Sequence, residues 1–180
     1  MKYMFASDVH GSAYYCRKML DAYKEEKAER LVLLGDLLYH GPRNDLPREY
    51  APKQVISMLN DMKKEIYAVR GNCEAEVDQM VLQFPVMADY CILNLDGRTF
   101  YATHGHIYNE NNLPPIQEGD ILIHGHTHVL KAEQKEGYVL LNPGSVSIPK
   151  EGIPPTYAIF EDGVFTIKDF EGNIVKSIEL

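Results

Sequence analysis

Near the start of the chain stands the stretch Tyr3-Met4-Phe5-Ala6-Ser7-Asp8-Val9-His10-Gly11-Ser12. Its first four residues form a short apolar run, which is typical of a buried strand. The run stops at Ser7-Asp8, where polar and turn-forming residues begin. The stretch therefore predicts a core strand that leads into a loop carrying an aspartate and a histidine.

The same arrangement recurs twice further along the chain. Apolar runs at residues 31–34 and 66–69 are followed by Gly35-Asp36 and Gly71-Asn72. Between the runs, residues 16–23 show helical apolar spacing, and Pro52 opens a second helical segment. Alternating strands and helices predict a parallel sheet with right-handed crossovers. In such sheets ligands bind beyond the carboxyl ends of the strands, which is where these polar motifs fall.

Beyond Pro85 the pattern becomes β-rich. Two strand-like segments, residues 92–95 and 99–103, flank Asp96-Gly97, a strong hairpin signal. Further short runs occupy residues 121–123, 138–141, 157–160 and 164–167. We therefore expect an α/β fold, a four-layer α/β/β/α sandwich in which two mixed sheets pack face to face with helices outside. We expect a single domain spanning residues 1–180, since domains usually run to about 100–200 residues.

Composition narrows the function classes. The chain is 45% hydrophobic and 24% charged, which is ordinary for a globular protein. Its formal net charge of −8 disfavours a long nucleic acid as partner. The three cysteines are an odd number without paired spacing, so no disulfide framework is predicted. We find neither a signal peptide nor a long apolar stretch, and so expect a cytoplasmic protein without a membrane partner.

Five short motifs gather five of the seven histidines beside aspartate, asparagine and glycine. Carboxylate, amide oxygen and neutral imidazole together suit first-row divalent metals. The side chains are sufficient for two ions, and a two-metal site favours displacement on phosphorus or hydrolysis of another ester or amide. The motifs are Asp8-Val9-His10, Gly35-Asp36, Gly71-Asn72-Cys73-Glu74, His104-Gly105-His106 and Gly125-His126-Thr127-His128.

Each motif alone has a plainer interpretation. Asp8 can serve as a helix cap or turn residue. Asp36 can imitate the acidic residue of a dinucleotide fold, but the Gly-x-Gly-x-x-Gly that such a fold requires is missing after the first strand. His126 and His128 can reach two different ions from one turn, but a histidine pair alone does not establish a metal site. The ordered set at the ends of predicted strands is what predicts a metal centre.

With this ordered set, the chain resembles the calcineurin-like metallophosphoesterases. Their pattern runs Asp-x-His, Gly-Asp, Gly-Asn-His-Asp/Glu, His and Gly-His-x-His, and the resemblance extends from the first strand to Ser147. Residues 5–12, 40–44, 69–73 and 142–150 are similar to the small bacterial phosphodiesterases of the YfcE type.

The resemblance implies two divalent metal ions, with manganese expected and iron, nickel, cobalt or zinc as alternatives. It implies hydrolysis of small phosphodiesters by a hydroxide that bridges the ions, since bound water can fall from a pKa of about 15.7 to about 7. The implied ligands of one ion are Asp8, His10, Asp36 and His128. Those of the other are Asp36, Asn72, His104 and His126, with Asp36 bridging.

Cys73 departs from the family pattern, which has a histidine at this position that is thought to protonate the leaving oxygen. A thiol is a weaker hydrogen-bond donor than imidazolium. If Cys73 is catalytic, we expect a preference for esters whose leaving group departs without a proton, such as aryl diesters. The alternative is that Cys73 is a small packed residue.

Arg43 and Arg70 are the candidates for binding substrate, because guanidinium can hold phosphate oxygens in a bidentate fork. Arg70 can equally form a structural ion pair. His106 can face the substrate phosphate or be a hydrogen-bonded structural residue. For His124 we expect a structural role.

The leading hypothesis is therefore a metal-dependent phosphodiesterase acting on a small phosphate ester. A phosphomonoesterase or nucleotide hydrolase would use the same site. A third alternative is a non-catalytic scaffold similar to the retromer subunit of this fold, against which the complete ligand set argues. Scattered tyrosines would suit a homodimer, and the sequence leaves the oligomeric state open.

Overall fold

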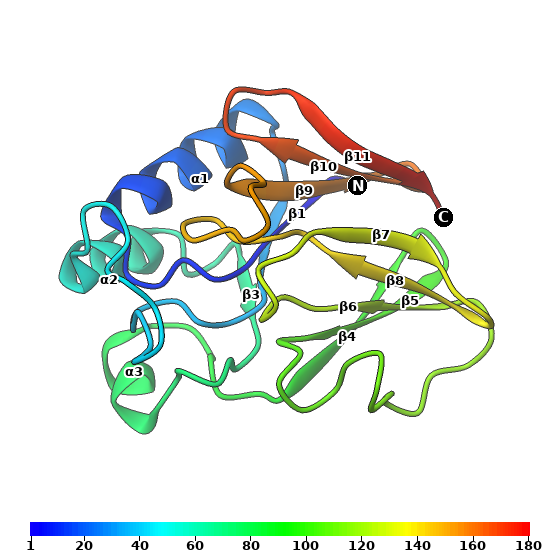
Figure 1. Ribbon diagram of the computed structural model, residues 1–180, viewed down its shortest axis with the longest axis horizontal. Helices are drawn as coiled ribbons and strands as arrows, with labels where there is room; N and C mark the ends of the chain where they lie inside the picture. Colours follow the sequence, from blue (N-terminus) through cyan, green and yellow to red (C-terminus); the bar gives the residue numbers. More distant parts are fainter.

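A computed structural model describes residues 1–180, and Figure 1 shows two sheets with the helices gathered on one side of the molecule. The elements in chain order are β1 (Tyr3–Ala6), α1 (Ala13–Glu25), β2 (Arg30–Leu33), α2 (Pro52–Asp61), β3 (Ile66–Ala68), α3 (Glu76–Val81), β4 (Tyr90–Leu95), β5 (Arg98–Thr103), β6 (Asp120–Ile123), β7 (Lys131–Gln134), β8 (Tyr138–Asn142), β9 (Thr156–Glu161), β10 (Val164–Asp169) and β11 (Ile174–Glu179).

The first sheet has six strands in the order β11-β10-β9-β1-β2-β3. Its β1, β2 and β3 run parallel, with Phe5 opposite Val32 in the register of the first pair. Strand β9 pairs antiparallel with β1, and β10 and β11 continue antiparallel. The helical crossovers predicted between the early strands are present as α1 and α2. Ser12 caps α1 by accepting the backbone N–H of Tyr15, and Pro52 occupies the first turn of α2.

The second sheet has five strands in the order β4-β5-β6-β8-β7. Strands β5, β6 and β8 are parallel, and the edge strands β4 and β7 pair antiparallel with them. Both sheets are therefore mixed: the parallel strands β1, β2 and β3 form one half of the first sheet, and β5, β6 and β8 form the centre of the second.

Alternation along the strands divides the core into two clusters. Met4 of β1 faces α1 and α2, while its neighbour Phe5 faces the second sheet and stacks on Phe100 of β5, with ring centroids 6.0 Å apart. The helices thus cover the outer face of the first sheet. Over the outer face of the second sheet lies the segment after β5, where the Tyr101 hydroxyl donates to the Pro115 carbonyl.

The predicted fold class is confirmed: two mixed sheets pack face to face, with the helices outside the first sheet. The outer layer on the second sheet is built from loop rather than helix. Three elements were not predicted, namely α3, β7 and β11. The helix α3 has six residues and buries none of them, and the two strands lie at sheet edges.

None of the helices combines the length and the apolar character that crossing a membrane requires.

Candidate metal centre

The predicted motifs meet at the edge where the parallel strands end. Asp8 follows β1, Asp36 follows β2 and Asn72 follows β3 in the first sheet. His104 follows β5, and the pair His126 and His128 follows β6 in the second sheet. Face-to-face packing therefore brings together side chains that lie up to 120 positions apart in sequence.

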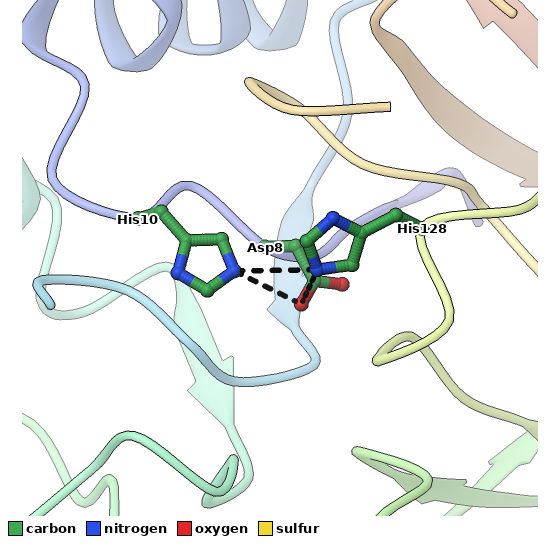
Figure 2. Close-up of side chains that lie close together, drawn as sticks. All are labelled: Asp8, His10 and His128. Carbon is green, nitrogen blue, oxygen red and sulfur yellow. Dashed lines mark hydrogen bonds and ion pairs between the residues drawn. The ribbon is translucent and has the colours of Figure 1, made fainter. Parts of the chain in front are cut away.

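Asp8, His10 and His128 form the first group, which Figure 2 shows with both rings directed at the carboxylate. The Nε2 atoms of His10 and His128 are 3.3 Å apart, and they lie 3.5 Å and 3.2 Å from Asp8 Oδ1. All three side chains are buried. Potential ligand atoms of this group lie within 4.8 Å of one another, close enough to hold one ion.

The second group comprises Asn72, His104 and His126. His104 Nε2 lies 3.1 Å from Asn72 Oδ1 and 3.2 Å from His126 Nδ1. Asp36 stands between the two groups, since its Oδ2 is 3.4 Å from His104 Nε2 and 3.7 Å from His10 Nε2. The seven side chains predicted as ligands are therefore brought together, and Asp36 lies between the two groups.

Backbone carbonyls set the orientation of three of the rings. The Nδ1 atoms of His10, His104 and His128 lie 2.7, 2.6 and 2.7 Å from the carbonyl oxygens of Tyr39, Leu34 and Ile148. A carbonyl can only accept, so each Nδ1 carries the proton and donates it. In the neutral ring the Nε2 lone pair then faces the cluster, which is the arrangement usual for histidine ligands of metals.

The pKa values of the aspartates and histidines in the site are strongly shifted by burial and by one another. Burial alone would raise the pKa of Asp8, but the rings of His10 and His128 outweigh it and hold that pKa well below its usual range. Burial alone would lower the pKa of His104, yet Asp36 and Asp8 raise it to about 9. His126 differs, because burial and the neighbouring His104 lower its pKa to about 4.

The loops that carry the ligands have strained backbones. Left-handed φ angles are uncommon for residues with a side chain, and they cluster at functional sites. Two glycines allow the loops to approach: a Cβ on Gly71 would collide with Asp36 Oδ1, and one on Gly125 would lie 2.7 Å from Asp8 Oδ2. The five predicted ligands with positive φ are Asp8 (60°), His10 (48°), Asp36 (55°), His126 (66°) and His128 (61°).

These residues fit divalent cations. Asp8 Oδ1 is buried and makes no hydrogen bond, although a buried carboxylate oxygen needs a partner. Imidazole lone pairs, two carboxylates and an amide oxygen converge around it, and they would repel one another without positive charge between them. This donor set suits manganese, iron, cobalt, nickel or zinc.

Glu74 has a positioning role that sequence reasoning missed. Its buried carboxylate accepts the backbone N–H groups of Asp36, Leu37 and Gly71 at 2.8, 2.7 and 2.6 Å. It thereby joins the loop after β2 to the loop after β3. Its place in the Gly-Asn-Cys-Glu motif was the available signal, but nothing in the sequence distinguishes a ligand from a support.

A polar cavity of about 450 Å³ opens beside the predicted ligands, and no hydrophobic residue lines it. Arg43, a predicted substrate-binding residue, lines this cavity, and so does Lys150, which was not predicted. The backbone N–H of Lys150 donates to the His128 carbonyl, which fixes this segment beside the ligand loop. The full lining is Arg43, Asn44, Asn72, His126, Thr127, His128 and Lys150.

The other predicted site residues lie around the centre. Arg70 does not line the polar cavity, and its Nε and Nη2 both donate to Asp89 Oδ1, at 2.9 and 2.6 Å. The His106 ring lies 5.4 Å from the His104 ring, and burial lowers its pKa. The Cys73 thiol lies within 4.8 Å of ligand atoms of His10 and Asp36, and burial followed by the Asp36 charge raises its pKa.

Comparison with known proteins agrees with this geometry. Residues 1–162 match the Calcineurin-like phosphoesterase superfamily domain. The chain therefore belongs to the calcineurin-like phosphoesterase superfamily.

Among its relatives, phosphodiesterase YfcE of Escherichia coli is 46% identical over 167 residues, covering 93% of this chain and 91% of the relative. A solved structure of the E. coli phosphoesterase YfcE superposes with a TM-score of 0.97 at 43% identity, covering 99% of both chains. A Vps29 single mutant from Entamoeba histolytica shares the fold, with a TM-score of 0.68 at 21% identity over 100% of this chain and 99% of its own.

Proposed function

We propose that this protein is a phosphodiesterase that uses two divalent cations, preferably manganese, to hydrolyse small phosphodiesters. Asp8, His10 and His128 would hold one ion, and Asn72, His104 and His126 the other, with Asp36 shared between them. When bound, the pair supplies an acidified water and neutralises charge on the phosphoryl oxygens.

In the overall reaction, water forms one new bond to phosphorus and the bond from phosphorus to one alcohol oxygen breaks. The products are a phosphomonoester and that alcohol, and the proton of the water passes to the alcohol oxygen or to solvent. Arg43 and Lys150 are cations on the wall of the polar cavity, so they can bind the phosphate and the polar part of the substrate. We assign no substrate contact to Arg70, whose guanidinium is paired with Asp89.

The Cys73 thiol lies beside His10 and Asp36, which supports a role for it near the departing oxygen. Its raised pKa keeps the thiol protonated at neutral pH. A thiol is a weak donor, so it offers little help to an alcohol that needs a proton in order to leave. This supports a preference for aryl diesters, whose leaving groups depart as anions. His106, beside His104, is a second residue that can face the substrate.

The observation that carries the proposal is the position of Asp36 between two groups of ligand atoms. The 46% identity to a relative named as a phosphodiesterase supports the choice of reaction. The complete donor set also argues against a non-catalytic scaffold.

The test is a comparison of bis-aryl phosphodiester and aryl phosphomonoester turnover after loading with Mn²⁺, Co²⁺, Ni²⁺ or Zn²⁺. We expect diester turnover to exceed monoester turnover and to require added metal. Preferential monoester turnover would instead make the protein a phosphomonoesterase or nucleotide hydrolase. Metal binding without hydrolysis of either ester would indicate a binding protein.

A further inference from the structure

A second recess adjoins the metal centre and is apolar. It is a shallow groove of about 450 Å³, and eight of its ten lining residues are hydrophobic. Cys73 lines it, and the Cys73 thiol is also within 4.8 Å of the ligand atoms of His10 and Asp36. The groove therefore begins at the reacting centre. Its lining residues are Leu38, Tyr39, Tyr50, Pro52, Ile56, Cys73, Ala75, Val77, Asp78 and Val81.

The loop between β2 and α2 separates the two recesses. Arg43 and Asn44 in the middle of this loop line the polar cavity, while Tyr39 and Tyr50 at its ends line the groove. The His40 ring packs edge-on against both tyrosines, with centroids 4.7 Å and 5.2 Å away, and Asn44 donates to the His40 carbonyl. These contacts hold the loop between the two recesses. Arg43 faces the polar cavity, and the two tyrosines face the apolar groove.

The lining of the groove suits an uncharged, apolar part of a ligand. Asp78 is its single charged lining residue, and its Oδ2 is occupied by the backbone N–H of Ala75. Tyr39 and Val77 remain 43% and 60% exposed, so apolar surface is available to a ligand. A groove of this size lies within the range of small-molecule pockets, and apolar walls favour aromatic or alkyl groups.

We propose that the groove is a substrate subsite that binds an apolar arm, aryl or alkyl, of the phosphodiester. The other arm of the same diester lies in the polar cavity with Arg43 and Lys150. The protein thereby selects asymmetric diesters that join an apolar alcohol to a polar or anionic one. This inference rests on the proposed function, because it takes the phosphate to lie at the metal centre between the two recesses.

The test measures binding without turnover, using phosphonates, whose carbon–phosphorus bond is not hydrolysed. Titration calorimetry on the Mn²⁺-loaded full chain compares 1-naphthylphosphonate with methylphosphonate. We expect the naphthyl compound to bind roughly tenfold more tightly, a difference of about 1.4 kcal/mol. Val77→Asp should lower the affinity for naphthylphosphonate far more than that for methylphosphonate and so remove most of the advantage, and Val77→Leu should retain it. Val77 lies in the first turn of α3, where an acidic residue is compatible with the helix.

The matched control is Val175→Asp, which makes the same change at an exposed valine on β11, outside both recesses. It should bind both phosphonates as the wild type does. Equal naphthylphosphonate affinity in Val77→Asp and wild type would overturn the subsite, even if diester hydrolysis is intact. If Val77→Asp changed the oligomeric state in a sedimentation experiment, the groove would be a subunit interface. That result too would overturn the subsite. If the wild type bound neither Mn²⁺ nor either phosphonate, that result would instead refute the proposed function.

Discussion

Replacing Glu74 by glutamine alters the carboxylate that joins the two loops bearing Asp36 and Asn72. One oxygen, Oε1, accepts the Leu37 N–H, and Oε2 accepts those of Asp36 and Gly71. Glutamine keeps one acceptor oxygen, and its NH₂ group would face at least one of these buried N–H donors. The substitution is close to isosteric, so it tests hydrogen bonding rather than packing.

The expected cost follows from these contacts. A buried donor without a partner costs about 1–3 kcal/mol, and bonds to a charged acceptor are stronger than neutral ones. A partial offset exists, because burial raises the pKa of Glu74 and a neutral amide avoids that desolvation. We therefore expect the free energy of unfolding of the metal-free protein to fall by about 2 kcal/mol. Since Glu74 fixes the loop that carries Asp36, metal affinity should fall by about 10–100-fold.

Urea denaturation of metal-free protein measures the first effect, and Mn²⁺ titration calorimetry measures the second. Glu136→Gln, at an exposed residue, is the matched control and should match the wild type in both. Wild-type stability in Glu74→Gln would refute the hydrogen-bonding argument. Reduced stability with unchanged metal affinity would show that Glu74 supports the fold without positioning Asp36.

Chelation by EDTA should lower the Tm of the metal-loaded protein, because ions that bind only the folded state stabilise it; an unchanged Tm would indicate that no ion is held. Lys150→Ala should raise KM for diesters with an anionic arm more than for neutral diesters. The control Lys53→Ala, at an exposed lysine that lines neither recess, should leave both KM values unchanged. Equal KM values in the two variants would remove Lys150 from the substrate site. Cys73→His should raise turnover of diesters with poor leaving groups relative to aryl diesters, measured as the ratio of their kcat/KM values. Unchanged selectivity would remove Cys73 from the mechanism.

Much of the fold was predictable because its central strands are buried. The apolar runs that became β1, β2 and β6 each end at a polar motif, so both the strand and its functional end were visible in the sequence. The elements that were missed carry little such signal. The sequence Lys-Ala-Glu-Gln of β7 is polar, and β11 lies at a sheet edge with largely exposed side chains.

The supporting parts of the site were harder to predict, since they depend on contacts between distant segments. Lys150 enters the cavity because its backbone is hydrogen-bonded to His128. The ion pair of Arg70 with Asp89 joins residues 19 positions apart. The apolar groove is assembled from three segments that lie apart in the sequence. Ligand residue types can be read along the chain, whereas their supports require the folded structure.

The most direct test of the metal centre is anomalous diffraction from crystals soaked with Mn²⁺. We expect two anomalous peaks on either side of the Asp36 carboxylate, about 3.5–4 Å apart. One peak should contact Asp8, His10 and His128, and the other Asn72, His104 and His126. A single peak, or peaks that do not share Asp36, would contradict the two-metal centre on which the proposed chemistry depends.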